Sequence, residues 1–450
     1  MSETVEVDVV VLGAGPGGET VGGLLGKAGV DVVVVEEHLV GGECPFYGCV
    51  PSKLMIAGAR RAAEGSPDWA HVAQRIRSDA THDWTDTPFA ERLVGHGARL
   101  VRGRGRIVGP RRVAVDGTTY VARRGVVLNT GTRPAVPPVE GLAGTPFWTN
   151  RDIVRLTELP GSIVVLGAGP IGVELAQVLA RFGVAVTLVD QAPRLLPRDE
   201  PEASRVLAEA LAADGVRLVL SAGVDRVAHA DGGFVVEVGE ETLRAERLLV
   251  AAGRTLQLDD LGLEAADVVV DGGALEVDER MRVRAATAGD GGGPWLWAVG
   301  DITGKGAFTH VSNYQGRVAV RDLLGQDGPW ADYRAATRVT YTEPEIAVVG
   351  LTEAQARESG AYAMEVAVGD LGARGWLDET DGVVKLVADT SQGSGVLVGA
   401  TVAGPAAGEV IGLLATAVHA RVPLADLRTM HFAYPTYHRA IETVLWRLPH

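Results

Sequence analysis

The sequence predicts an α/β fold built on two copies of one β-α-β unit and followed by a C-terminal α+β domain. The heptapeptide VVLGAGP occurs at residues 10–16 and again at 164–170. Each copy ends a run of β-branched residues typical of a buried parallel strand, and a helical pattern follows it. A second apolar strand then ends each unit in an acid, Glu36 in the first and Asp190 in the second. From about Arg338 the pattern changes to alternating strands and then helices, with no further copy of the motif.

The first copy contains the pattern Gly-x-Gly-x-x-Gly at Gly13, Gly15 and Gly18. Between a strand and a helix, the first glycine allows a tight turn and the second lets a pyrophosphate approach the backbone. The third lets the helix pack against the strand. The helix N-terminus then faces the phosphates. Glu36 would accept hydrogen bonds from a ribose diol.

The second copy repeats the pattern at Gly167, Gly169 and Gly172, followed by Asp190. The interval from first glycine to acid is the same in both copies. One isolated glycine motif fits an ordinary turn, but two copies with matched acids favour two Rossmann-like nucleotide-binding domains.

The acid of the second copy bears on the choice of nucleotide. A carboxylate at Asp190 would bind a free ribose 2′-hydroxyl and repel a 2′-phosphate. The sequence therefore favours NADH over NADPH, although Arg194 and Arg198 lie close by and could soften that preference.

Composition excludes several classes of protein. The 450 residues are 46% hydrophobic and 22% charged, which is typical of globular domains. A net charge of −15 argues against nucleic-acid and anionic-membrane partners. The sequence has no apolar run of membrane length and no basic segment of a signal peptide at its start, so we expect a cytoplasmic protein. Its two cysteines are close together, which in a reducing compartment suggests redox chemistry or a metal, and further metal ligands are not evident nearby.

The most specific signal is GGECPFYGCVPSK at residues 41–53. It has two cysteines with four residues between them, Cys44 and Cys49, followed by a hydrophobic residue, Pro, Ser and Lys53. Over essentially its whole length, the chain resembles the class I pyridine nucleotide–disulfide oxidoreductases, which include dihydrolipoamide dehydrogenase, glutathione reductase and mercuric reductase. The alternative interpretation of the motif is two buried structural thiols.

The resemblance implies a homodimeric enzyme that uses FAD and NAD(P)H and acts on a small molecule. Hydride would pass from the nicotinamide to the flavin, and electrons then to the Cys44–Cys49 disulfide. Cys49 would be the flavin-side sulfur and Cys44 the exposed interchange thiol. Lys53, paired with Glu174, would tune the flavin by its positive charge.

The resemblance also assigns binding residues and domains. FAD contacts fall on Gly42, Lys53, Gly105, Thr130, Gly131 and Asp301. Nicotinamide-cofactor contacts fall on Val224, Gly253 and Arg254. The expected domains are an FAD-binding domain (1–148), an NAD(P)-binding domain (149–270), a central segment completing the FAD domain (271–335) and a dimerisation domain (336–450).

The C-terminal segment departs from the family pattern. The disulfide reductases of the family have a His there, followed five residues later by a Glu, and the partner subunit supplies this dyad. Here Tyr434 and Arg439 occupy those positions. A phenol titrates near 10, so Tyr434 is a poor general base at neutral pH, although it can donate a hydrogen bond. If Pro435 opens a helix, His438 lies one turn above Tyr434 on the same face and is a candidate substitute.

The hypotheses on function differ mainly in the molecule that accepts the electrons. Retention of both cysteines favours a small disulfide or thiol-linked substrate. The missing dyad favours a diaphorase-like reaction with a quinone or a metal ion, because that reaction requires less proton transfer. Mercuric reductases also carry a tyrosine at this position, but the chain lacks their C-terminal cysteine pair. A non-catalytic redox-sensing flavoprotein, which would keep both cofactor folds without turnover, is a third hypothesis. The bulky segment Pro45–Tyr47 between the cysteines is expected to reshape the pocket near the disulfide.

Overall fold

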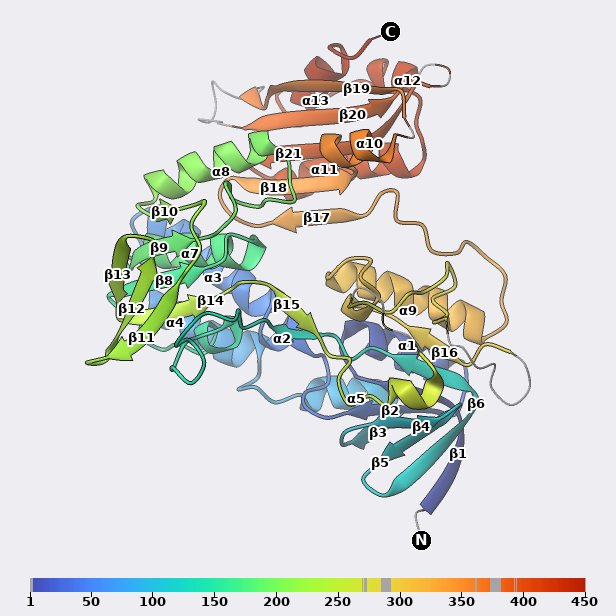
Figure 1. Cartoon of the computed structure of the whole chain (residues 1–450). Helices are drawn as coiled ribbons and strands as arrows, with labels where there is room; N and C mark the ends of the chain where they lie inside the picture. The colour runs from blue at the N-terminus through green and yellow to red at the C-terminus, as the bar shows by residue number, and fades with distance from the viewer. Residues whose placement is uncertain are drawn as a thin grey trace. The chain divides into compact units, whose positions relative to one another are not determined.

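The computed structural model describes residues 3–268, 270, 273–284, 293–360, 362–372, 382–391, 393 and 395–449. The chain divides into two compact units (Figure 1). Unit 1 comprises Met1–Pro51, Gln74–Pro134 and Arg254–Asp332, and unit 2 comprises Ser52–Ala73, Ala135–Gly253 and Tyr333–His450. Unit 2 therefore holds both the second repeat and the C-terminal domain, and the four-domain division stays a prediction.

The first repeat builds the main sheet of unit 1, with strand order β3-β2-β1-β6-β5-β4 and β16 added beside β6. Its strands are β1 (Glu3–Leu12), β2 (Val32–Glu36), β3 (Arg99–Arg102), β4 (Arg106–Gly109), β5 (Arg112–Val115), β6 (Thr118–Leu128) and β16 (Leu296–Ala298). Strands β1, β2, β3, β6 and β16 pair in parallel. All five residues of β2 are buried, as expected for a parallel strand covered on both faces.

Helices of unit 1 connect and cover this sheet. They are α1 (Pro16–Lys27), α2 (Glu43–Phe46), α5 (Thr87–Gly95), α9 (Thr309–Leu323), the π-helix Ile76–Ala80 and the 3₁₀ turns Leu263–Ala266 and Asp301–Thr303. Helices α3 (Cys49–Ala63) and α4 (Trp69–Arg75) cross the boundary between the units, and β7 (Thr132–Pro134) pairs with β15 (Arg254–Leu256). Helices α1 and α9 pack so closely that a Cβ at Gly316 would lie 3.1 Å from the carbonyl oxygen of Gly17.

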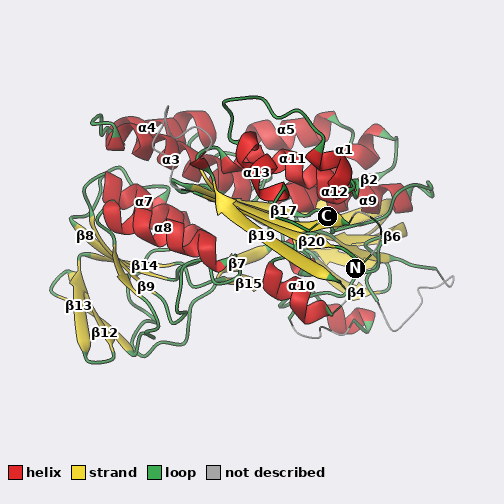
Figure 2. Cartoon of the chain, turned by 90° about the horizontal axis from the view of Figure 1, so that it is seen from above, coloured by secondary structure: helices red, strands yellow, loops and turns green. Residues whose placement is uncertain are grey.

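The second repeat forms a four-stranded parallel sheet in unit 2, with order β10-β9-β8-β14. Its elements are α6 (Asn150–Ile153), β8 (Ser162–Leu166), α7 (Pro170–Arg181), β9 (Ala185–Val189), α8 (Pro201–Ala213), β10 (Arg217–Val219) and β14 (Arg247–Val250). The antiparallel strands β11 (Arg226–Ala230), β12 (Gly233–Val238) and β13 (Glu241–Ala245) form a separate small sheet. Figure 2 shows α7 and α8 beside the parallel strands.

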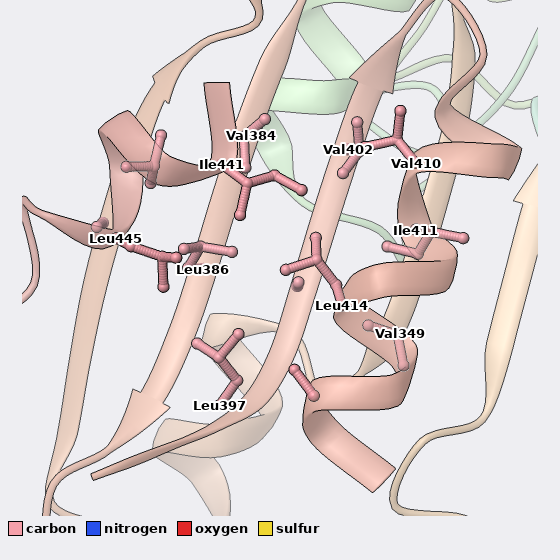
Figure 3. Packing of buried hydrophobic residues seen from close by; sticks show 14 of the residues in the cluster. Val349, Val384, Leu386, Leu397, Val402, Val410, Ile411, Leu414, Ile441 and Leu445 are labelled. Carbon is pink, nitrogen blue, oxygen red and sulfur yellow. The ribbon is translucent and has the colours of Figure 1, made fainter. Parts of the chain in front are cut away.

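The C-terminal part of unit 2 is an antiparallel sheet of order β17-β18-β21-β20-β19 with helices packed on it. Its elements are β17 (Thr337–Thr340), β18 (Glu345–Gly350), α10 (Glu353–Ser359), β19 (Met364–Asp370), β20 (Val383–Asp389), β21 (Val396–Gly404), α11 (Ala407–His419), α12 (Leu424–Arg428) and α13 (His438–Leu445). Ile411 and Leu414 of α11 and Ile441 of α13 meet the sheet in one apolar cluster (Figure 3). The predicted fold class, two Rossmann-like domains plus an α+β domain, is confirmed.

Candidate active site

The first glycine turn lies between β1 and α1 and requires glycine for steric reasons. Gly13 has φ of +94°, and a Cβ there would lie 2.3 Å from the carbonyl oxygen of Asn129. A Cβ at Gly18 would lie 1.9 Å from the carbonyl oxygen of Gly13. Gly15 caps α1 in an extended conformation. The tight turn and the close helix packing predicted for Gly13 and Gly18 are thus present.

Glu36 ends β2 against this turn. Its two carboxylate oxygens accept hydrogen bonds from the backbone N–H groups of Ala14 and His38, each at 2.7 Å. Burial raises the pKa of Glu36, and the two backbone hydrogen bonds oppose that rise. The carboxylate is therefore fixed beside the turn, where each oxygen keeps a lone pair for a ribose hydroxyl.

Asn129, which the sequence reasoning missed, holds the turn together. Its Oδ1 accepts a hydrogen bond from Gly18 N at 2.8 Å, and its Nδ2 donates to the carbonyl oxygen of Val299 at 2.9 Å. This buried side chain thereby joins α1 to the ends of β6 and β16. The only available sequence signal was its place directly before Thr130 and Gly131, at the end of a buried strand.

The predicted flavin-site residues Thr130, Gly131 and Asp301 lie in unit 1 with the first turn. The Thr130 hydroxyl donates to the carbonyl oxygen of Gln257 at 2.6 Å. Gly131 has φ of +68°. Asp301 opens the 3₁₀ turn after β16 and accepts a hydrogen bond from the Thr132 hydroxyl at 2.8 Å. This arrangement keeps the Asp301 carboxylate at the end of the parallel sheet.

Arg254, predicted to contact the nicotinamide, has partners within unit 1. Its Nε donates to the Thr132 hydroxyl at 2.6 Å, and its Nη2 lies 3.4 Å from Oε2 of Glu43. The guanidinium thus links β7 to the residue next to Cys44. A nicotinamide contact for Arg254, like those for Val224 and Gly253, stays a prediction.

Two further glycines assigned to FAD occupy tight positions in unit 1. Gly42 has φ of +65°, and a Cβ there would lie 3.0 Å from the Cα of Gly15, so two side-chain-free backbones meet beside the turn. A Cβ at Gly105 would lie 2.5 Å from Leu12 Cδ2. The packing of β1 therefore requires glycine at position 105 independently of any ligand.

The second glycine turn, in unit 2, repeats the geometry of the first. A Cβ at Gly167 would lie 2.4 Å from the carbonyl oxygen of Ala251, and one at Gly172 would lie 1.8 Å from that of Gly167. A Cβ at Gly169 would meet no atom within 4 Å. The turn thus leaves open space at the glycine predicted to face a pyrophosphate.

Asp190 matches Glu36 in its hydrogen bonds. Its oxygens accept from the backbone N–H groups of Ala168 at 2.6 Å and Ala192 at 2.7 Å. The guanidinium of Arg194 donates to the carbonyl oxygens of Leu196 and Pro197. The guanidinium of Arg194 is thus already hydrogen-bonded to backbone carbonyl oxygens.

The two cysteines meet where α2 and α3 adjoin. Cys44 lies in the single turn of α2, and Cys49 is the first residue of α3. The Cys49 sulfur lies 3.4 Å from the hydroxyl of Thr309, the first residue of α9. A hydrogen bond with the Cys49 sulfur, followed by burial, raises the pKa of the Cys44 thiol. The Cys44 thiol therefore holds its proton more tightly than a free thiol does.

The two thiols differ in exposure, and the roles assigned to them stay predictions. Cys44, expected to be the exposed thiol, is half-buried, and Cys49 is exposed. Cys44 is covered because it lies beside the buried residues Pro45 and Phe46, whereas Cys49 opens a helix. The segment between the cysteines is held by Phe46, whose ring lies 5.4 Å from that of Phe89. Phe46 is thus buried within unit 1, and the expected reshaping of the pocket near the disulfide stays a prediction.

Lys53 and Glu174 form the expected ion pair, in unit 2. The Lys53 Nζ lies 2.9 Å from Glu174 Oε2 and 4.2 Å from the centre of the Tyr341 ring. Glu174 is buried, and its Oε1 accepts a hydrogen bond from Tyr341 N at 2.8 Å. Lys53 is therefore held four residues along α3 from Cys49.

The C-terminal segment corrects one expectation. Helix α13 begins at His438, not at Pro435, so Tyr434 lies outside the helix. The Thr436 hydroxyl donates to the carbonyl oxygen of Ala433 at 2.6 Å, and this local bond holds a turn ahead of the helix. Tyr434 is 66% exposed, and Arg439 pairs with Glu442. His438 and Tyr434 therefore do not share a helix face.

Comparisons with known proteins agree with this geometry. The sequence pattern described as pyridine nucleotide-disulphide oxidoreductase matches residues 7–316, and that of the family's dimerisation domain matches 336–445. The chain belongs to the pyridine nucleotide-disulphide oxidoreductase family. As a member of this family it is an oxidoreductase that uses FAD and NAD(P)H. Its dimerisation domain supports assembly as a homodimer.

Relatives of known name fall in the same family. A dihydrolipoyl dehydrogenase of Halobacterium salinarum is 32% identical over 96% of this chain and 94% of its own length. A mercuric reductase of Acidithiobacillus ferrooxidans is 31% identical over 96% of this chain and 80% of its own. The Cu(II) complex of the HOCl-induced flavoprotein disulfide reductase RclA from Escherichia coli has a TM-score of 0.86 at 27% identity, covering 98% and 99% of the two chains.

The residues that the structure describes contain no group of three or more His, Cys, Asp or Glu side chains that could hold a metal ion. Within the same residues, no helix is long and apolar enough to cross a bilayer.

Proposed function

We propose that the chain passes electrons from NADH through FAD to its Cys44–Cys49 pair, and from there to a small disulfide or thiol-linked substrate. The supporting observation is the placement of both cysteines where α2 and α3 adjoin, in the same unit as the first glycine turn. A redox-active pair needs this proximity to a nucleotide site, whereas two structural thiols do not.

The residues of unit 1 fit the dinucleotide cofactor. FAD, when bound, accepts a hydride and passes on two electrons. The side-chain-free backbone of Gly15 and Gly42 would face its pyrophosphate, Glu36 its ribose hydroxyls, and Asp301 its ribitol or pyrophosphate region. In unit 2, Gly169 and Asp190 would hold NADH in the same way.

The cysteines would carry out the exchange with the substrate in two steps. Cys44 gives up its proton to a base, its sulfur attacks one sulfur of a disulfide RSSR, the substrate S–S bond breaks, and the leaving thiolate takes up that proton. Cys49 then attacks the Cys44 sulfur, which re-forms the Cys44–Cys49 bond and releases the second thiol. Two electrons and two protons leave the dithiol, and two thiols RSH form. Tyr434 and His438 of the partner subunit in a homodimer are the proposed donors of the first proton.

Reduction of a metal ion is the second candidate function. The structurally similar RclA has been solved as a Cu(II) complex. A metal ion would be a substrate here, and it would need no proton from a His–Glu dyad. Such an ion would take its electrons from the flavin or from the thiols.

The test compares wild type with Cys44→Ser and Cys49→Ser under anaerobic conditions. NADH oxidation is followed with bis(2-hydroxyethyl) disulfide, with a benzoquinone and with Cu(II). We expect both variants to lose disulfide reduction by more than about a hundredfold, because the thiolate is the nucleophile, while quinone reduction persists. Wild-type turnover with quinone or Cu(II) but none with disulfides, unchanged in Cys44→Ser, would refute the disulfide reaction.

A further inference from the structure

We infer that the hydroxyl of Thr309 is a further catalytic group of the cysteine centre. It donates a hydrogen bond to the Cys49 sulfur whenever that sulfur carries negative charge. In the structure, Thr309 Oγ1 lies 3.4 Å from Cys49 Sγ. The inference rests on the proposed function, because it assigns a role in the exchange between Cys44 and Cys49.

Thr309 is rigidly held, so the contact is a fixed feature of unit 1. It opens α9, a helix of 15 residues. Gln315 of the same helix is fully buried, accepts a hydrogen bond from Gly300 N at 2.6 Å and donates to the Thr303 hydroxyl at 3.0 Å. One turn closer to Thr309, Ser312 lies 3.5 Å from Asn129 Nδ2. These bonds fix the start of α9 against the same turns that form the first nucleotide site.

The hydroxyl lies where the exchange places charge. While the substrate is bound to Cys44 as a mixed disulfide, Cys49 must stay a thiolate in order to attack the Cys44 sulfur. A hydroxyl that donates to a thiolate stabilises it, because hydrogen bonds to charged groups are stronger than those to neutral ones. The Cys49 sulfur and burial raise the pKa of Cys44, and the Thr309 hydroxyl acts in the opposite direction. Thr309 thus contacts Cys49 directly, and its hydroxyl can donate without giving up its own proton.

Charged neighbours could also influence these sulfurs, and the test must hold them constant. Glu43 precedes Cys44 on α2, His310 follows Thr309 on α9, and Lys53 lies one turn from Cys49 on α3. Thr309→Val keeps the size and branching of the side chain but removes the hydroxyl. Thr309→Ser keeps the hydroxyl. Both variants leave the neighbouring charges in place, so a difference between them isolates the hydrogen bond.

The experiment measures the pH dependence of Cys49 alkylation in the FAD-loaded protein. The chain has two cysteines, so in a Cys44→Ser background neutral iodoacetamide reports on Cys49 alone, by intact mass. We expect Thr309→Val to move the pH of half-maximal rate upward by about one unit, a roughly tenfold slower reaction near pH 7. Thr309→Ser should stay close to the parent. Thr309→Ala serves as a second hydroxyl-free variant if the valine variant does not fold.

If the valine, alanine and serine variants all keep the pH profile of the parent, Thr309 has no role in stabilising the Cys49 thiolate. If all three shift the pH of half-maximal rate by the same amount, the cause is packing and not the hydroxyl, and the inference is also overturned. The outcome is separable from the proposed function. Failure of wild type to reduce any disulfide would refute that function and leave the alkylation result standing. An unchanged alkylation profile with normal disulfide turnover would refute only the inference about Thr309.

Discussion

The ammonium group of Lys53 lies 2.9 Å from the carboxylate of Glu174, and that carboxylate also binds the backbone N–H of Tyr341. Three elements of unit 2 thus meet at one buried acid: α3, α7 and the segment that follows β17. The pair fixes the charged group of Lys53 on the helix that begins with Cys49.

Replacement of Lys53 by Met should destabilise the protein, because it leaves the buried Glu174 without its cation. We expect the free energy of unfolding to fall by about 1–3 kcal/mol, the range for a buried polar group that loses a partner. Glu174→Gln should cause a smaller loss, since its amide oxygen can still accept from Tyr341 N. Urea unfolding of both variants measures the difference. Equal stability of wild type and Lys53→Met would contradict the structural importance of the pair.

Two glycines of the second turn should separate folding from nucleotide binding. Gly172→Ala places a Cβ 1.8 Å from the Gly167 carbonyl oxygen, so we expect loss of folded protein. Gly169→Ala meets no protein atom within 4 Å, so the fold should persist. If the pyrophosphate of NADH lies at Gly169, the KM of the Gly169→Ala variant for NADH should rise about tenfold or more, because the added methyl group blocks close approach to the backbone. A folded Gly169→Ala variant with unchanged KM would show that the nucleotide binds elsewhere.

Asp190 should set the preference for NADH. In Asp190→Asn the negative charge that repels a 2′-phosphate is gone, so the ratio of kcat/KM for NADH to that for NADPH should fall by about tenfold or more. Arg194→Ala is the matched control, because its guanidinium is bound to the carbonyl oxygens of Leu196 and Pro197. That variant should keep the wild-type ratio. The prediction fails if Asp190→Asn keeps the wild-type ratio or if Arg194→Ala changes it more.

A buried lysine joins the second repeat to the C-terminal sheet within unit 2. Lys385 on β20 is 3% exposed and lies within 3.0 Å of carboxylate oxygens of Glu200, Glu202 and Glu353. Burial opposes its charged form, but these hydrogen bonds outweigh burial and raise its pKa. Lys385→Met should lower the free energy of unfolding by about 3–5 kcal/mol near pH 7, because it leaves buried carboxylates uncompensated. Glu202→Gln should cost about 1 kcal/mol or less, since Glu202 is partly exposed.

The same cluster predicts a pH dependence. The hydrogen bond from Lys385, followed by that from Arg357, lowers the pKa of Glu353 below its ordinary 4.5. A carboxylate with a lowered folded pKa adds stability that is fully present above the unfolded pKa and is lost as the pH falls through the folded value. Wild type should therefore lose stability below about pH 4.5, and Lys385→Met should lose less over that range. Urea unfolding near pH 7 and pH 4 tests this, and parallel losses in both proteins would contradict it.

The sequence by itself determined the repeated β-α-β units, the glycine turns and the acids at Glu36 and Asp190. These features follow from short-range rules: strand and helix periodicity and the residues that a tight turn can accept. The roles of the two cysteines and the Lys53–Glu174 pair followed from the resemblance. Local spacing did not fix the start of α13, because a side-chain bond from Thr436 holds a turn ahead of that helix.

Tertiary structure decided which distant side chains share a site. Thr309 meets Cys49 across 260 residues, and Asn129 joins Gly18 to Val299 across 111 and 170 residues. Such contacts depend on strand order and on where each helix packs, and no local pattern encodes them.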